Sequence, residues 1–182
     1  LWFGVDDSYS TCYVPIYCGI TEIPECFEVG NGDLLNYSET SAFWAFNFVA
    51  NFAYLRYSDM IQDVRKVQHE LEEKYITLTP YIDKAAKDLL AAEGPAKARK
   101  FLTEYSVNES NNMTKRWKEL GQYLLVKYLD GNIKKEENGK FMLNEYGLPA
   151  IPHFPGYPEW WYRAIVNSTG DHFKVIQPAQ SN

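Results

Sequence analysis

Residues 41–75 contain neither Gly nor Pro, and their apolar side chains recur at the spacing of an α-helix. In the second half of this stretch, spacings of three and four place one apolar stripe along a single face: Ala53, Tyr57, Met60, Val64, Val67, Leu71 and Tyr75. In the first half, aromatic residues surround the whole circumference, which predicts burial on every side. Ser41 is the predicted N-cap. One helix of this length is expected to form the spine of an α+β, mostly helical fold.

Short strands and a long loop are predicted before this helix. Residues 1–5 and 11–17 have strand character and are joined by a polar turn over residues 6–10. The continuous apolar run over residues 1–5 indicates a buried strand. Pro15 cannot donate a ladder hydrogen bond, so the second strand is expected to end there or to lie at an edge. Residues 18–40 are predicted to form an irregular connection.

Further helices are predicted after residue 75. Pro80 is expected to open a helix that ends at Gly94, and Pro95 to open another. Polar residues 106–112 are expected to break that helix, and a last one is predicted over residues 113–129. Residues 134–140 indicate a charged hairpin or loop. We therefore predict one domain over residues 1–182, with strands and a loop in 1–40, helices in 41–133 and a loop-rich tail in 134–182.

The overall composition excludes two classes of partner. The net charge of -6 argues against binding to the phosphates of nucleic acids, which requires a clustered basic surface. No apolar stretch reaches the ~18 residues that a membrane-spanning helix needs, so no membrane partner is expected. The aromatic share of 16% predicts a dense core or a large shared interface. Composition leaves the cellular compartment open.

Few residues suggest catalysis or metal binding. Cys12, Cys18 and Cys26 allow three interpretations: a zinc site, one disulfide plus a free thiol, or buried small apolar residues. The last is favoured, because the gaps are too wide for close ligand pairs and no His is near. The neighbouring carboxylates Asp6 and Asp7 are interpreted as turn residues rather than as a catalytic dyad. The residues alone therefore predict no catalytic or metal site and no cofactor.

The order of several segments nevertheless resembles a known family. These segments are residues 11–19 (TCYVPIYCG), 23–27 (IPECF), 30–33 (GNGD), 41–51 (SAFWAFNFVAN) and 56–61 (RYSDMI), followed by residues 120–125 with 130–131 and by 156–161 (GYPEWW). Their succession resembles the later part of bacterial cysteine dipeptidases of the N-terminal-nucleophile (PepD-like) family. The resemblance covers nearly the whole chain.

The resemblance implies a fold and a mechanism. The fold would be part of an α-β-β-α sandwich, and the activity would be hydrolysis of dipeptides without metal or organic cofactor. The nucleophile would be a cysteine at the N-terminus of the processed enzyme, with its α-amino group as proton acceptor. None of the three cysteines matches its motif, and Leu1 opens an apolar run without an initiator Met. We therefore expect the nucleophile in an upstream part of the same polypeptide, and no activity from these residues alone.

A rival hypothesis is a non-catalytic, helical binding or assembly module, which the aromatic content and the lack of a catalytic motif favour. Under the dipeptidase hypothesis, the upstream part of the polypeptide would supply a strand beside residues 1–5. Without that strand, residues 1–5 would expose the main-chain N–H and C=O groups along their edge. The aromatic surface around Trp2, Phe3 and residues 43–52 would be uncovered as well. Self-association of the isolated chain is the expected consequence.

Overall fold

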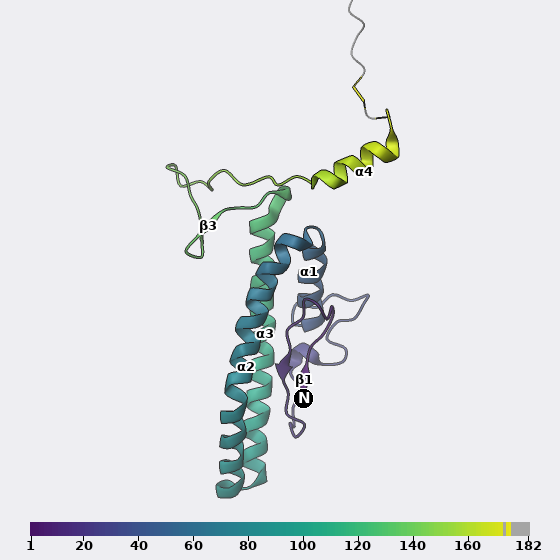
Figure 1. The fold of residues 1–182 in the computed structure, drawn as a ribbon. Helices are drawn as coiled ribbons and strands as arrows, with labels where there is room; N and C mark the ends of the chain where they lie inside the picture. The colour runs from purple at the N-terminus through teal and green to yellow at the C-terminus, as the bar shows by residue number, and fades with distance from the viewer. Residues whose placement is uncertain (173, 176–182) are drawn as a thin grey trace, which may run out of the picture. The chain divides into compact units, whose positions relative to one another are not determined.

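The computed structural model describes residues 1–172 and 174–175 and confirms an α+β, mostly helical chain. It divides into two compact units, residues 1–126 and 127–182. Within the described residues, ten elements follow one another: β1 (Trp2–Phe3), β2 (Val14–Pro15), η1 (Glu25–Phe27), α1 (Ala42–Tyr54), α2 (Tyr57–Glu93), α3 (Pro95–Tyr128), η2 (Leu129–Gly131), β3 (Glu136–Glu137), β4 (Lys140–Phe141) and α4 (Glu159–Thr169). Figure 1 shows them along the chain.

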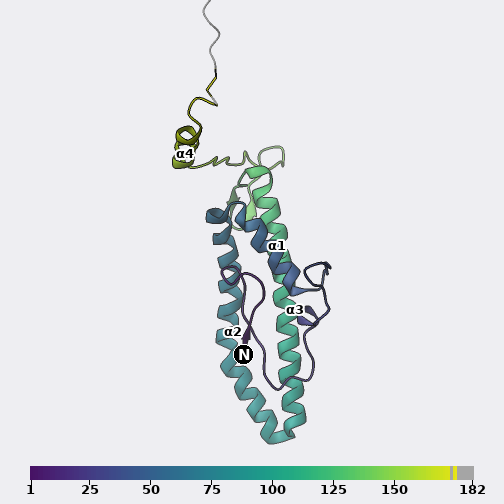
Figure 2. The same ribbon diagram turned by 90° about the vertical axis from the view of Figure 1, so that its right-hand side faces the viewer.

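The first unit is built on a hairpin of two long helices, α2 and α3, which run side by side in Figures 1 and 2. Gly94 alone separates them, with a φ of 86° that favours glycine over any residue with a Cβ. The predicted stripe on α2 is buried from Met60 to Tyr75, and Trp117, Leu120 and Leu124 of α3 are buried as well. These two apolar faces form the core of the unit.

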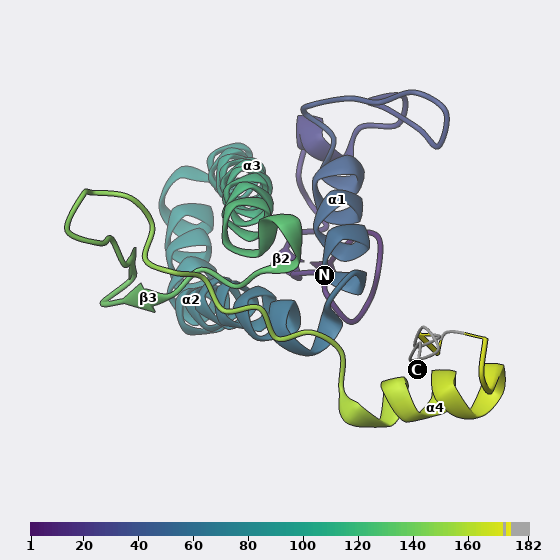
Figure 3. The same cartoon turned by 90° about the horizontal axis from the view of Figure 1, so that it is seen from above.

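The predicted single helix over residues 41–75 is two helices. The chain breaks between α1 and α2, where Arg56 has a φ of -153° and a ψ of 65°. The break lets α1 turn back beside the hairpin, as the view from above shows (Figure 3). There Phe46 stacks on Trp117 of α3, with ring centroids 4.5 Å apart. A straight helix could not bury both the stripe of α2 and Phe46 against the same partner helix, so tertiary packing overrides local helical preference.

Two further helix boundaries were predicted wrongly. Pro80 lies inside α2 and opens no helix. Pro80 and Ile76 are exposed, so water can satisfy the carbonyl group that the missing N–H of Pro80 leaves free. Polar residues 106–112 also fail to break α3, because the hydroxyl groups of Ser106 and Ser110 donate to main-chain carbonyls one turn back and leave the helix intact.

The N-terminal segment is only partly strand. β1 and β2 form an antiparallel two-stranded sheet, in which Trp2 pairs with Pro15 and Phe3 with Val14. The expectation that residues 1–5 are buried is wrong, since Leu1, Trp2 and Phe3 are exposed, whereas Val14 on β2 is fully buried and β2 contacts α2. The irregular connection over residues 18–40 is confirmed, with η1 as its one short helix. The small sheet therefore covers the hairpin through β2.

The second unit contains the charged hairpin of β3 and β4, which confirms the prediction for residues 134–140. Lys127 and Glu136 form an ion pair at 2.9 Å within this unit. Helix α4 has no buried residue. Among the residues that the structure describes, no helix is both long enough and apolar enough to cross a bilayer.

Candidate functional site

The three thiols are free, and none is arranged as a nucleophile. Cys12 and Cys26 are buried, which confirms the favoured interpretation for these two. Burial, together with the charge of Glu72, raises the pKa of Cys12 well above its ordinary value, and burial also raises the pKa of Cys26. Cys18 is exposed, which the interpretation did not anticipate, and it has no hydrogen bond to any described residue. Because the thiolate is the reactive form, raised pKa values make the buried thiols inert.

The three histidines do not form a metal site. His69 is exposed on α2, and the main chain of His153 pairs with Ile133 in the second unit. Within residues 1–172 and 174–175, no group of three or more His, Cys, Asp or Glu side chains is placed to hold a metal ion.

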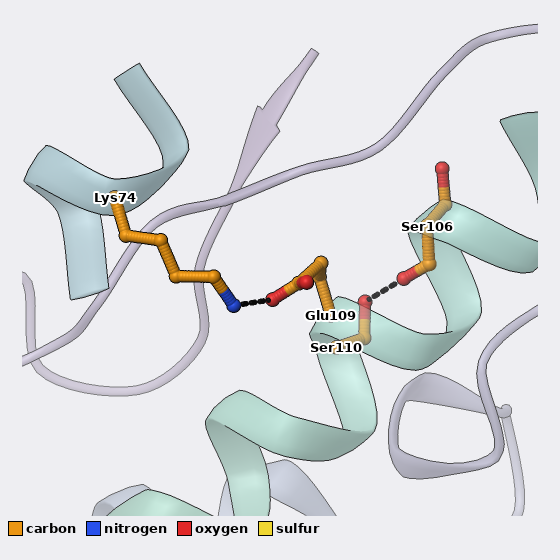
Figure 4. Close-up of polar contacts among 4 residues, drawn as sticks. All are labelled: Lys74, Ser106, Glu109 and Ser110. Carbon is orange, nitrogen blue, oxygen red and sulfur yellow. Dashed lines mark hydrogen bonds and ion pairs between the residues drawn. The ribbon is translucent and has the colours of Figure 1, made fainter. Parts of the chain in front are cut away.

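A row of small hydroxyl side chains runs along α3 at helical spacing: Thr103, Ser106, Ser110 and Thr114, all buried. Each hydroxyl donates to the main-chain carbonyl four residues earlier, for example from Ser110 to Ser106 at 2.7 Å (Figure 4). Two of them also accept main-chain N–H groups from the N-terminal segment, Ser106 from Tyr17 and Thr103 from Thr21. Their protons are already engaged, so this row positions the N-terminal segment and offers no nucleophile.

Helix α2 holds the same segment from the other side. The Gln68 amide donates to the main-chain oxygen of Thr11 at 2.7 Å, and Glu72 accepts the main-chain N–H of Tyr13 at 2.9 Å. The two helices are joined by an ion pair between Lys74 and Glu109, with 2.6 Å between Nζ and Oε2 (Figure 4). These polar contacts fix the N-terminal segment on the helical hairpin.

Asp6 and Asp7 are turn residues, as predicted, and they also tie the turn to α1. The Asp7 carboxylate accepts the N–H of Tyr9 at 3.1 Å, and the Tyr54 hydroxyl donates to it at 2.7 Å. This hydrogen bond raises the pKa of Tyr54. Asp6 accepts from the Asn47 amide at 3.0 Å. Each carboxylate thus has a separate partner on α1, and the two do not form an acid–base pair.

The best candidate site is a groove of about 810 Å³ in the first unit. Its walls are the residues before α1, the outer face of α1 and one turn of α3. The lining combines aromatic rings, side-chain amides and one charge of each sign: Tyr37, Ser38, Glu39, Trp44, Ala45, Asn47, Phe48, Asn51, Phe52, Leu55, Lys118 and Gln122. The volume and the mixed lining are typical of ligand sites.

The aromatic wall of the groove is held in place before any ligand binds. The rings of Phe48 and Phe52 are nearly parallel, with centroids 6.2 Å apart. The Trp44 indole donates to the main-chain oxygen of Asn36 at 2.9 Å. Asp33 in turn accepts the main-chain N–H of Asn36, and hydrogen bonds from Asn36 lower the pKa of this carboxyl. A wall fixed in this way binds without a large ordering cost.

Sequence reasoning missed this groove. It predicted that the first half of the long helix would be buried on every side, but Phe48 is 47% exposed and Tyr54 58% exposed. Aromatic residues around a whole helix were the available signal, and they mark a helix with one face in the core and another in a groove. The cation of the groove, Lys118, lies too far along the chain for any local pattern to connect it with α1.

Comparison with known proteins gives one match. Residues 1–70 match the model of peptidase family C69, a stretch that runs from β1 into the first part of α2. Neither the search of curated proteins nor the search of solved structures found a match. The family match supports a peptidase, and it includes the α1 wall of the groove but not Lys118 or Gln122.

Proposed function

We propose that this chain is part of a cysteine dipeptidase whose nucleophile lies in a polypeptide segment preceding Leu1. The observation that carries the proposal is the match of residues 1–70 to peptidase family C69. The resemblance of several ordered segments to the N-terminal-nucleophile dipeptidases points to the finer assignment. Dipeptides are the proposed substrates, and the preceding segment of the same polypeptide is the proposed partner.

In this mechanism the thiol of an N-terminal cysteine attacks the carbonyl carbon of the peptide bond. Its own α-amino group accepts the thiol proton and passes it to the leaving amine, and water then hydrolyses the thioester. An α-amino group with a pKa near 8 suits this transfer around neutral pH. The state of the three thiols supports a nucleophile elsewhere, because two are buried with raised pKa values and Cys18 has no hydrogen-bonded base among the described residues.

The proposed fold of the whole enzyme is an α-β-β-α sandwich to which this chain contributes a part. In the part of the chain that the structure describes, the sheet of β1 and β2 has two strands, and residues 1–3 are exposed. Strands of a preceding segment would pair with its free main-chain groups and cover the exposed Trp2 and Phe3. Helices α1 and α2 would then form one helical layer of the sandwich.

The test is to express the polypeptide encoded from further upstream and to measure dipeptide hydrolysis. Serine in place of the first cysteine of the processed enzyme should abolish hydrolysis, while Cys18→Ser, an exposed thiol in this chain, should leave it unchanged. Dipeptide hydrolysis by residues 1–182 alone, or retained activity without the first cysteine, would overturn the proposal.

A second candidate function is a non-catalytic binding module, which the preformed groove favours. The same experiment separates the two hypotheses. A longer polypeptide that is folded and processed but hydrolyses no dipeptide would favour the binding module.

A further inference from the structure

Two charged residues line the groove, the half-buried Lys118 and the exposed Glu39. Lys118 is half-buried on α3, and among the described residues it forms no ion pair and no hydrogen bond. Lys127, which is also half-buried, pairs with Glu136. Glu39, at the other charged position of the groove, likewise has no partner among residues 1–172 and 174–175. Because Lys118 lines the groove without a counter-ion, a ligand that brings an anion can pair with it.

We propose that the groove binds the C-terminal end of a short peptide with an apolar last residue. The Lys118 ammonium pairs with the terminal carboxylate, and the last side chain lies against the rings of Phe48 and Phe52. This inference deepens the proposed peptidase function and rests on it for the choice of a peptide as ligand.

The charges favour a peptide over other anions. One cation and one anion line the groove, so a ligand with two or more negative charges, such as a phosphate ester, would be repelled by Glu39. A short peptide carries one carboxylate and one ammonium, which complement Lys118 and Glu39 respectively. An apolar acid such as a fatty acid would satisfy Lys118 alone.

The remaining lining suits the peptide backbone. Asn47, Asn51 and Gln122 present side-chain amides, which both donate to and accept from peptide groups. Asn47 and Asn51 lie one turn apart on α1 and are held by hydrogen bonds to Asp6 and to the main chain. Aromatic walls with a few fixed polar groups provide affinity through the walls and orientation through the polar groups.

The experiment measures binding to residues 1–182 by calorimetry, with the intrinsic fluorescence of the five tryptophans, of which Trp44 lines the groove, as a second readout. The probes are Ala-Phe, its C-terminal amide and octanoate. We expect Ala-Phe to bind, and its amide to bind about tenfold more weakly, because a charged hydrogen bond is lost. Lys118→Met should weaken the binding of Ala-Phe by a similar factor and remove the preference for the acid. The matched control is Lys115→Met, an exposed lysine one turn away on α3 that should bind like the wild type.

Three results would overturn the inference: equal affinity for the acid and the amide, equal losses in the two lysine variants, or octanoate binding as tightly as Ala-Phe. Circular dichroism checks that Lys118→Met is folded, and Phe48→Ala, which should reduce the preference for Phe over Ala at the last residue, provides an independent variant. Sedimentation reports whether a second copy covers the groove instead, which would also overturn the inference. Because this chain is tested without the proposed nucleophile, missing binding contradicts only the groove, whereas missing hydrolysis in the longer polypeptide contradicts the proposed function.

Discussion

The close approach of α1 and α3 at Gly121 leads to a quantitative prediction. A Cβ atom at Gly121 would lie 2.8 Å from Cδ1 and 2.9 Å from Cε1 of Phe48, well inside van der Waals contact. The same Cβ atom would lie 3.4 Å from Cγ2 of Val49, which is an ordinary van der Waals distance. Gly121→Ala therefore forces the ring of Phe48 to move. Since that ring is half exposed, its free direction is into the groove.

Two opposing terms determine the stability of this variant. Replacing Gly by Ala inside a helix stabilises the protein by about 1 kcal/mol. Inserting a methyl group into a filled contact costs roughly 1–3 kcal/mol. The net expectation is a destabilisation of roughly 0–2 kcal/mol. If Phe48 is first replaced by Ala, the clash is gone, so Gly121→Ala should then stabilise the chain by up to about 1 kcal/mol.

A double-mutant cycle of Gly121→Ala and Phe48→Ala measures this difference. Urea unfolding followed by far-UV circular dichroism gives the free energy of unfolding of the four proteins, and we expect a coupling energy of roughly 1–3 kcal/mol. Gly121→Ala should also weaken the binding of Ala-Phe, because the displaced ring narrows the groove. A gain of about 1 kcal/mol from Gly121→Ala in the wild-type background, as at an unhindered helical glycine, would refute the reasoning.

Three further predictions concern the polar contacts and the exposed sheet. Tyr17→Phe should cost about 1 kcal/mol, since its hydroxyl donates to Asp83 at 2.7 Å. Burial and this bond raise the pKa of Tyr17 above its ordinary value of 10.0, so this stabilisation is present below about pH 10 and is lost as the pH rises further. Lys74→Met should cost roughly 1–3 kcal/mol, because it leaves Glu109, whose side chain is 13% exposed, without its cation. Self-association through β1 should appear in light scattering at roughly tens of micromolar.

Matched controls make these predictions decisive. Tyr81→Phe removes an exposed hydroxyl on α2, and its urea midpoint should follow that of the wild type at both pH 8 and about pH 10.5. Lys87→Met removes an exposed lysine of α2 and should change stability by less than about 0.5 kcal/mol. Equal losses in the variants and their controls would contradict the assigned contacts, and a clean monomer in light scattering would contradict self-association.

The fold was predictable from the sequence where the local repeat of apolar residues determines the secondary structure and the buried face. The stripe from Met60 to Tyr75 repeats every three or four residues, and burial follows that repeat directly. The break at Arg56 was not predictable, because no Gly or Pro marks it and the stacking of Phe46 on Trp117 that accompanies it joins residues distant in sequence. At Pro80 the error was the opposite one, because a helix start was predicted where the helix continues. Proline often occupies the first turn of a helix, but the exposed face of the long helix α2 tolerates it in the interior.

The candidate site was less predictable than the fold. Phe48 is visible in the sequence as one of many aromatic residues, and Lys118 as one of many lysines. Their proximity depends on the turn after α1 and on Gly94, which together return α3 to the side of α1. The sequence did show a family resemblance, part of which lies in residues 41–51 of the aromatic wall, but the resemblance assigns no role to these residues.

Only one of the two walls of the groove lies within the residues that match the peptidase family, and a last prediction follows from the other wall. The aromatic wall on α1 lies within the matched residues 1–70, whereas Lys118 lies outside them. If Lys118 alone sets the preference for a carboxylate, then reversing its charge should reverse the preference without changing the apolar wall. In Lys118→Glu the groove holds two carboxylates, counting Glu39, so the C-terminal amide of Ala-Phe, which keeps only its ammonium, should bind more tightly than the acid. Lys115→Glu changes the net charge equally and should still prefer the acid. Calorimetry with both ligands on both variants measures this, and an unreversed preference in Lys118→Glu would show that another group recognises the carboxylate.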